Sequence, residues 1–160
     1  MTEGDDLPEL SNMEKYANYK EQMERLNRAM KERFFLEAMF IEYAVMEDRC
    51  ESILTPAGVF RADRHFTIIK KIRRIEALTQ SNALAAKYFS KDLLERMIVW
   101  KDKRNAFIHA LMKQVFTGND LEEIVLEGQA IIKALCTKST SYKRALERQA
   151  AKEAEENPLS

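Results

Sequence analysis

Arg104, Asn105 and His109 lie within six consecutive residues and carry the groups that cleavage of a phosphodiester needs. An imidazole can exchange a proton near neutral pH, so His109 can act as a general acid or base. Asn105 can orient that imidazole or hydrogen-bond a phosphate oxygen. The guanidinium of Arg104 can bind a phosphate through two parallel charge-assisted hydrogen bonds and stabilise charge that develops in the transition state. These three residues are the candidate catalytic residues.

A long helix, predicted over residues 90–115 with Ser90 as its N-cap, positions these side chains. Arg104 occupies a position in its apolar stripe, whose other members recur at alternating spacings of four and three: Leu93, Met97, Trp100, Phe107 and Leu111. Asn105 and His109 are neighbours one turn apart on the adjacent row. Residues five apart point about 140° from each other in an ideal helix, so Arg104 and His109 leave the helix in different directions.

A second charged residue, Glu47, interrupts an apolar stripe in an earlier predicted helix. The other members of that stripe are Leu36, Phe40, Tyr43, Cys50 and Leu54. Because an unpaired guanidinium is costly to bury, an ion pair between Glu47 and Arg104 would explain both positions. His109 would then be a neutral imidazole bonded to Asn105 or to a backbone carbonyl. Glu47 is therefore either a structural partner of Arg104 or a supporting residue of a catalytic site.

Arg104-Asn105 followed by three residues and His109 resembles the Arg-polar-x-x-x-His signature of the HEPN superfamily, whose members are α-helical bundles. The stretch from Val99 to Leu111 is similar to the motif helix of that family, and residues 34–54 resemble its first core helix. The resemblance spans residues 33–135, which leaves the N-terminal helix and the charged C-terminal segment outside it.

The resemblance implies a metal-independent endoribonuclease without a cofactor, in which the Arg and His of two chains face each other across a homodimer. It assigns the active site to Arg104, Asn105 and His109 and gives Glu47 no firm counterpart. An enzyme of this kind would serve as a toxin or in phage defence, with RNA as its substrate and a cognate antitoxin or regulatory protein as a further partner. Other family members are non-catalytic modules that bind protein or nucleic acid, which is the alternative function.

The composition predicts an all-α fold, because helix-favouring residues dominate and only four Gly and three Pro occur. The periodicity indicates an antiparallel bundle of four to five core helices with an extra N-terminal helix. Residues 10–54 form either one helix or two that meet near residues 28–33, and Pro56 with Gly58 ends this segment. Further helices are predicted over residues 63–78, 83–89 and 121–135, with Asn119 or Asp120 capping the last of these. We expect a disordered N-terminus over residues 1–9, the bundle over 10–136, and a charged helical or disordered tail over 137–160.

Positive and negative residues balance at 26 each, so the chain as a whole does not attract a polyanion. Contact with RNA must therefore depend on local patches. The most basic stretch is residues 61–74, and two further lysines lie beside the candidate catalytic residues. The candidate phosphate contacts are Lys70, Lys71, Arg73, Arg74, Lys101 and Lys103. A solvated face balanced by acidic neighbours is the alternative for the basic stretch.

Several other classes of protein do not fit the sequence. Cys50 and Cys136 lie far apart and lack the Cys/His spacing of a zinc site, so we expect no metal. There is no second His near His109, no Gly-rich phosphate loop and no setting for a nucleophilic Ser or Cys. The acidic N-terminus precedes no apolar signal core, and no apolar run approaches the roughly 18 residues of a membrane span. We therefore expect a cytoplasmic protein that does not bind membranes.

Overall fold

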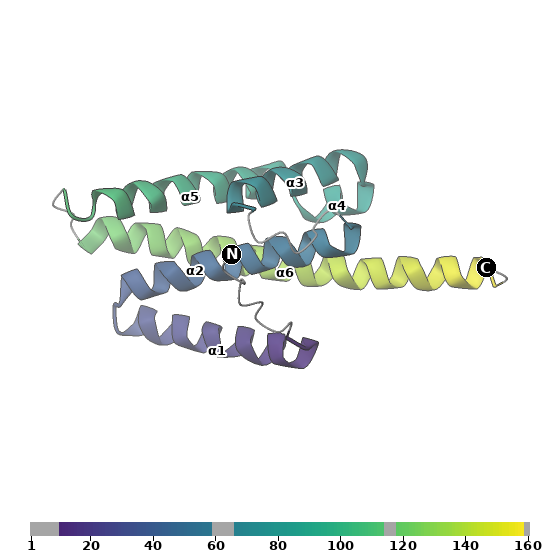
Figure 1. The fold of residues 1–160 in the computed structure, drawn as a ribbon, viewed down its shortest axis with the longest axis horizontal. Coiled ribbons are helices and arrows are strands. Elements are labelled where there is room, and N and C mark those ends of the chain that lie inside the picture. Colours follow the sequence, from purple (N-terminus) through teal and green to yellow (C-terminus); the bar gives the residue numbers. More distant parts are fainter. Residues whose placement is uncertain (1–9, 59–65, 114–117, 159–160) are drawn as a thin grey trace, which may run out of the picture.

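The computed structural model describes residues 10–58, 66–113 and 118–158, and all regular structure in these ranges is helical (Figure 1). The predicted all-α class is confirmed. Within the same ranges, no helix has the length and apolarity needed to cross a bilayer. The helices are α1 (Asn12–Lys31), α2 (Phe35–Leu54), the short 3₁₀ helix η1 (Thr55–Ala57), α3 (Ile68–Ser81), α4 (Ala83–Tyr88), α5 (Lys91–Ala110) and α6 (Gly118–Glu156).

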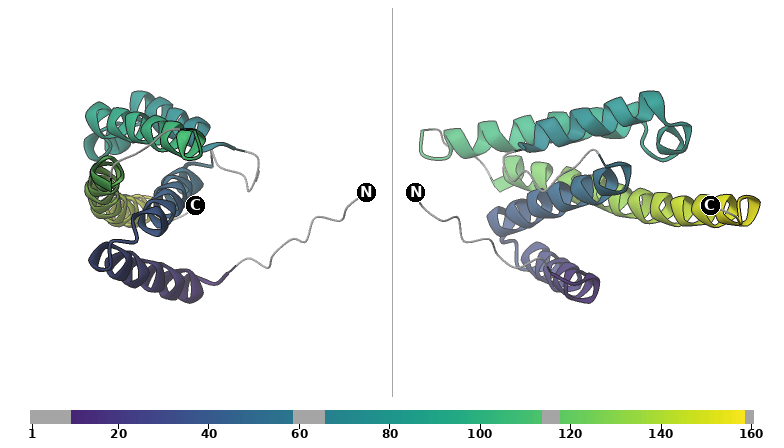
Figure 2. Two further views of the ribbon diagram at one scale, coloured as in Figure 1. Left: turned by 90° about the vertical axis from the view of Figure 1, so that its left-hand side faces the viewer. Right: turned by 45° about the vertical axis from the view of Figure 1, so that its right-hand side comes forward.

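Helix α2 is at the centre of the packing and contacts α1, α3 and α6. Helix α5 packs against α3 and α6, and it reaches α2 through the side chain of Arg104. Helix α1 covers the outer side of α2 (Figures 1 and 2). Helix α3 is shorter than α5, and α5 extends past it toward the end of the molecule where α2 begins (Figure 1). The C-terminal half of α5 therefore lies beyond the cover of α3.

The segment before Pro56 is two helices, and Arg33 makes the turn between them. Arg33 has a φ of 61°, the left-handed conformation that commonly ends a helix. The amide of Phe34 donates to the carbonyl of Ala29 at 2.8 Å and so satisfies a carbonyl of the last turn of α1. The guanidinium of Arg33 bonds Glu122 of α6 at 3.1 Å. Further along, the predicted stop near Pro56 is confirmed, with Gly58 at a φ of 66°.

The C-terminal segment, predicted from residue 137 as a helical or disordered tail, is helical, because α6 continues without a break from Gly118 to Glu156. The helix predicted to end at residue 135 is therefore longer than expected. Ser139, Tyr142 and Ala145 are buried, and the ring of Tyr142 lies 5.2 Å from that of Phe89 in an edge-to-face contact. Only residues 147–156 are exposed throughout, and Figure 1 shows this end of α6 projecting from the bundle. The helix also begins before Asn119 and Asp120, so neither of them is its cap.

Two other helix boundaries differ from the prediction. Helix α5 ends at Ala110 rather than near residue 115, and its last turn tightens as Leu111 donates to the carbonyl of Ile108. The predicted start of the third helix, at residue 63, and the predicted N-terminal segment, residues 1–9, lie outside the described residues. The described part of the third helix begins at Ile68 and extends three residues past the predicted end, to Ser81.

The stripe predicted for α2 is fully buried only at its C-terminal end, at Cys50 and Leu54. Leu36 and Phe40 are 40% and 55% exposed, and Glu47 is partly exposed. The face that packs against the other helices instead comprises Phe35, Met39, Glu42, Met46 and Ile53, all of them buried. Apolar residues surround much of α2, so its periodicity does not distinguish the two faces. The helices on either side, α1 and α6, decide which face is buried.

Candidate functional site

Helix α5 holds the candidate catalytic residues in its last two turns. As predicted, the hydroxyl of Ser90 caps the helix and accepts from the amide of Leu93 at 3.2 Å. The indole of Trp100 is buried and donates to the carbonyl of Ile124 in α6 at 2.8 Å. Phe107 is buried as well, so α5 is anchored on both sides of Arg104.

The guanidinium of Arg104 is held by neutral groups rather than by a carboxylate. Its Nη1 donates to Oδ1 of Asn105 at 3.0 Å. Its Cζ lies 4.0 Å from the centre of the Tyr43 ring and 5.4 Å from that of Phe40, both on α2. Rings at this distance attract a guanidinium through their negative faces. Burial lowers the pKa of Arg104 from its usual value, yet an Arg side chain stays a cation at neutral pH.

The predicted ion pair between Glu47 and Arg104 is absent. Glu47 instead accepts a hydrogen bond from Nζ of Lys71 at 2.7 Å, and Glu51 accepts one from the same atom at 2.6 Å. The physical reason is the packing of α3 on α2, which brings Lys71 to Glu47, whereas Arg104 meets α2 one turn earlier, over the ring of Tyr43. Arg104 has no carboxylate within ion-pair distance among the described residues, and its Nε is buried without a hydrogen-bond partner.

Lys71 is consequently not a phosphate contact. It is 3% exposed and sits between two carboxylates, which leaves its ammonium no access to a ligand. Burial acts to lower the pKa of Lys71, but the hydrogen bonds and charges of Glu47 and Glu51 outweigh it and raise the pKa above its usual value. The group contributes to the packing of α3 on α2.

His109 lies in the last turn of α5 and is exposed. It forms no hydrogen bond with Asn105, whose side-chain oxygen accepts from Arg104 instead. The helix is regular to Ala110, so the angular separation of Arg104 and His109 expected from an ideal helix applies. One chain therefore brings Arg104 and Asn105 together and leaves His109 to face elsewhere.

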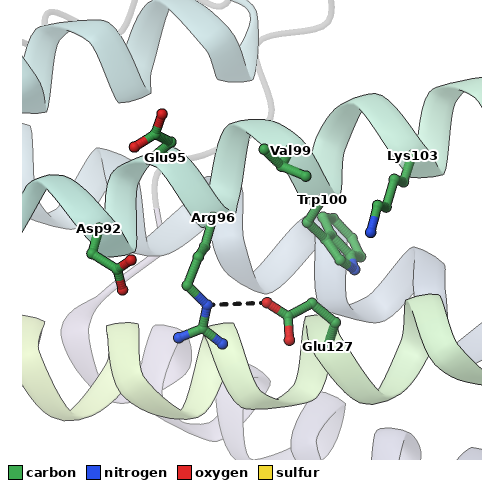
Figure 3. Close-up of a pocket in the computed structure, with 7 residues that line it drawn as sticks. All are labelled: Asp92, Glu95, Arg96, Val99, Trp100, Lys103 and Glu127. Atoms are coloured by element: carbon green, nitrogen blue, oxygen red, sulfur yellow. Dashed lines mark hydrogen bonds and ion pairs between the residues drawn. The ribbon is translucent and has the colours of Figure 1, made fainter.

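The remaining predicted phosphate contacts are spread over two helices. Lys70, Arg73 and Arg74 are exposed on α3. Lys101 is partly buried and pairs with the adjacent Asp102 at 2.7 Å. Lys103 is exposed, but it lines a different hollow of about 250 Å³ between α5 and α6, which contains none of the candidate catalytic residues (Figure 3). The other residues that line this hollow are Asp92, Glu95, Arg96, Val99, Trp100 and Glu127.

That hollow is a poor site for a phosphate. Arg96 is already bonded to Glu127 at 3.0 Å, and two more acidic side chains lie at the rim (Figure 3). Three carboxylates against two cations would repel an anion.

Glu42 is the ionisable residue that the sequence analysis missed. It is fully buried, and neither carboxylate oxygen has a hydrogen-bond partner. Burial raises its pKa to about 9, so the side chain is a neutral acid at physiological pH. It lies where α2 comes closest to α6, and a Cβ added at Gly128 would collide with Oε2 of Glu42. Glu42 follows Met39 by three residues and precedes Met46 by four. This spacing would have identified Glu42 as a core position if that face of α2 had been predicted to be buried.

No metal centre is evident in the described parts of the chain, where no three His, Cys, Asp or Glu side chains gather closely enough to hold an ion. Cys50 is a free, fully buried thiol whose pKa burial raises to about 12. Cys136 is also a free thiol and accepts a hydrogen bond from the hydroxyl of Tyr19 at 3.2 Å.

Comparisons with models of protein families, with curated proteins and with solved structures found no match.

Proposed function

We propose that this protein is a metal-independent endoribonuclease of HEPN type that acts as a homodimer, as a toxin or a phage-defence effector. The observation that carries the proposal is the guanidinium of Arg104. Two aromatic rings and Asn105 orient it, and no carboxylate in the described part of the chain neutralises it. A partly buried cation in this state is ready to bind an anion such as the scissile phosphate.

The proposed dimer supplies what a single chain lacks. His109 leaves α5 in a different direction from Arg104, so one chain does not place both on the same phosphate. Large apolar side chains are exposed near both residues, with Phe40 at 55% beside Arg104 and Met112 at 94% just after His109. A second copy related by a two-fold axis would cover these side chains and bring two motifs together.

In the proposed reaction, His109 of one chain removes the proton from the 2′-hydroxyl of the RNA, whose oxygen then attacks the adjacent phosphorus. The bond from phosphorus to the 5′-oxygen breaks, and the partner's His109 protonates that oxygen. Arg104 stabilises the negative charge on the phosphoryl oxygens, and Asn105 holds the guanidinium in place. The products are a 2′,3′-cyclic phosphate and a 5′-hydroxyl, and no step uses a metal.

Cleavage of single-stranded RNA in the presence of EDTA tests the proposal. We expect His109→Ala and Arg104→Ala each to reduce the rate by about 100-fold or more, in line with the loss of an acid or base or of a transition-state contact. Arg104→Lys keeps the charge but not the planar fork, so it should also be strongly impaired. Arg144→Lys, on the exposed surface of α6, is the matched control and should keep full activity. Wild-type rates in both alanine variants would refute catalysis by these residues.

The alternative is a non-catalytic helical module that binds a protein or nucleic acid. The stacking of Arg104 on Tyr43 favours it, since the same contact can simply join α5 to α2. In that case purified protein leaves RNA intact, and Arg104→Ala lowers the stability by only about 1 kcal/mol, because no buried carboxylate loses its partner. Thermal unfolding of the variants, measured beside cleavage, separates the two functions.

A further inference from the structure

A hollow of about 440 Å³ runs along the outer face of α3, on the side opposite the buried isoleucines of that helix. Three cations and three apolar side chains line it, and we call it the α3 groove. Its lining residues are Phe66, Ile69, Lys70, Arg73, Arg74 and Ala77. None of them belongs to the site around Arg104, and all are partly or fully exposed.

The α3 groove carries positive charge that its neighbours do not cancel. Arg73 is paired with Glu76, at 2.8 Å between Nη1 and Oε2. Lys70 and Arg74 have no carboxylate partner among the described residues. The contrast with Lys71 on the buried side of the same helix, which sits between two carboxylates, is clear. In a chain with no net charge, this groove is a local site of attraction for a polyanion.

The second feature of the α3 groove is a flat, partly exposed surface. The guanidinium of Arg74 lies over the ring of Phe66, with its Cζ 4.4 Å from the ring centre. Unpaired bases stack on aromatic rings and on guanidinium planes, whereas a duplex keeps its bases hidden. An acidic peptide would use only the charges of the groove. A single strand of RNA would use both the charges and the flat surface.

We propose that the α3 groove binds an unpaired stretch of the RNA. Lys70 and the edge of the Arg74 guanidinium contact phosphates, and a base stacks on the outer plane of that guanidinium, which covers Phe66. The inference extends the proposed function to substrate recognition and rests on RNA being the substrate. Because bases are read only when they are unpaired, it makes single-stranded RNA the preferred substrate over a duplex.

Helix α3 and Arg104 both contact the middle of α2. Lys71 joins α3 to Glu47 of α2, and Tyr43 lies one helical turn before Glu47. Arg104 stacks on that same Tyr43. The first turns of α3 and the C-terminal half of α5 thus adjoin the same part of α2.

Fluorescence anisotropy of a labelled single-stranded RNA oligonucleotide tests the groove, with His109→Ala as the background that prevents cleavage. We expect Lys70→Ala/Arg74→Ala to weaken binding about tenfold or more and to reduce the slope of log K against log salt by about 1.4, the value for two lost contacts to a single strand. Phe66→Ala should weaken binding about fivefold, and Phe66→Trp should retain it. Lys133→Ala/Lys143→Ala, which removes two exposed cations of α6, is the matched control.

The outcomes separate this inference from the proposed catalysis. Loss of RNA binding in the groove variants supports the groove as a binding site, even if no variant of Arg104 or His109 changes RNA cleavage. In the cleaving protein, groove variants should raise KM and leave kcat unchanged. Equal affinity of Lys70→Ala/Arg74→Ala and the control, or equal affinity for single-stranded and duplex RNA, would overturn the inference. So would binding to anionic lipid vesicles through the same cations in the absence of RNA binding.

Discussion

Arg104 and Glu42 both lack an ion-pair partner among the described residues, and burial affects them in opposite ways. Arg104 remains charged, because aromatic rings and an amide replace part of the water it loses. Glu42 takes up a proton instead, because its surroundings offer no hydrogen bond and no cation. The first arrangement suits binding of an anion, and the second reduces stability at neutral pH.

The raised pKa of Glu42 predicts a specific dependence of stability on pH. A carboxyl with a pKa of about 9 in the folded state and about 4.3 in the unfolded state stabilises the fold fully only below pH 4. Its contribution falls by up to about 1.4 kcal/mol per pH unit as the pH rises toward 9, because the unfolded state releases the proton first. Glu42→Gln removes this dependence, so the variant should become more stable than the wild type from pH 5 to pH 9.

Urea unfolding of the wild type and of Glu42→Gln at a series of pH values measures the difference directly. Using the difference between the two proteins cancels the carboxylates that both share. Glu47→Gln, which loses a partner of Lys71, should instead be destabilised at neutral pH. Parallel stability curves for the wild type and Glu42→Gln would contradict a neutral buried Glu42.

At this scale the sequence identified part of the site. Arg104 was recognisable because it interrupts an apolar stripe on α5, and its burial beside Phe107 agrees with that position. Its partners were not recognisable, since Tyr43 and Phe40 lie more than 60 residues away and stacking leaves no spacing signature. Glu42 was missed because both faces of α2 are apolar. The face that contains Glu47 was predicted to be buried, so Glu47 rather than Glu42 was taken as the charged residue in the core.

At the scale of the helices, the sequence predicted the boundaries that depend on caps and turns better than it predicted the contacts between helices. Ser90 and the turn at Gly58 are where their residue types predict them, because caps and turns depend on adjacent residues. The extent of α6 was underestimated, since the polar sequence after Thr137 resembles a solvated tail. One aromatic residue every few turns suffices to hold it, as Tyr142 does against Phe89.

Truncation of α6 tests where the packed part of this helix ends. A chain that ends at Leu146 loses only exposed residues, so its stability should stay within about 0.5 kcal/mol of the full chain. A chain that ends at Thr137 loses Tyr142 and Ala145 from the core and should be destabilised by about 3 kcal/mol or more. Thermal unfolding of the two truncated proteins gives the comparison. Equal stability would mean that Tyr142 contributes nothing to the bundle.

At the scale of the whole molecule, the net charge is zero, but paired and unpaired cations lie in different places. Acidic residues neutralise Lys71 and Arg96, while Lys70, Arg74 and Arg104 carry no carboxylate partner among the described residues. Which cations are paired depends on helix packing, and composition does not contain that information. The exposed apolar residues were not predictable either, because a sequence pattern does not say which face a second copy would cover.

The proposed dimer predicts that Met112 lies in an interface. Met112 is 94% exposed and follows His109 by less than one turn, so Met112→Glu should leave the monomer folded, shift the protein toward monomer and abolish cleavage. Met13 on α1, 84% exposed, provides the control, and Met13→Glu should change neither property. Sedimentation velocity together with RNA cleavage measures both effects. An active monomeric Met112→Glu protein would exclude a composite site at this face.

The close approach of α2 and α6 at Gly128 couples the residues allowed at two distant positions. Ala in place of Gly usually strengthens a helix by about 1 kcal/mol, but here its methyl group would meet Glu42 and the indole of Trp100. Gly128→Ala should therefore destabilise by about 1 to 3 kcal/mol in the wild type and by less in Glu42→Ala, where only the contact with Trp100 remains. A double-mutant cycle from urea unfolding measures this coupling, and additive effects would disprove it. A side chain as long as that of Glu42 thus requires glycine at position 128. Which residues are tolerated at either position depends on the residue at the other.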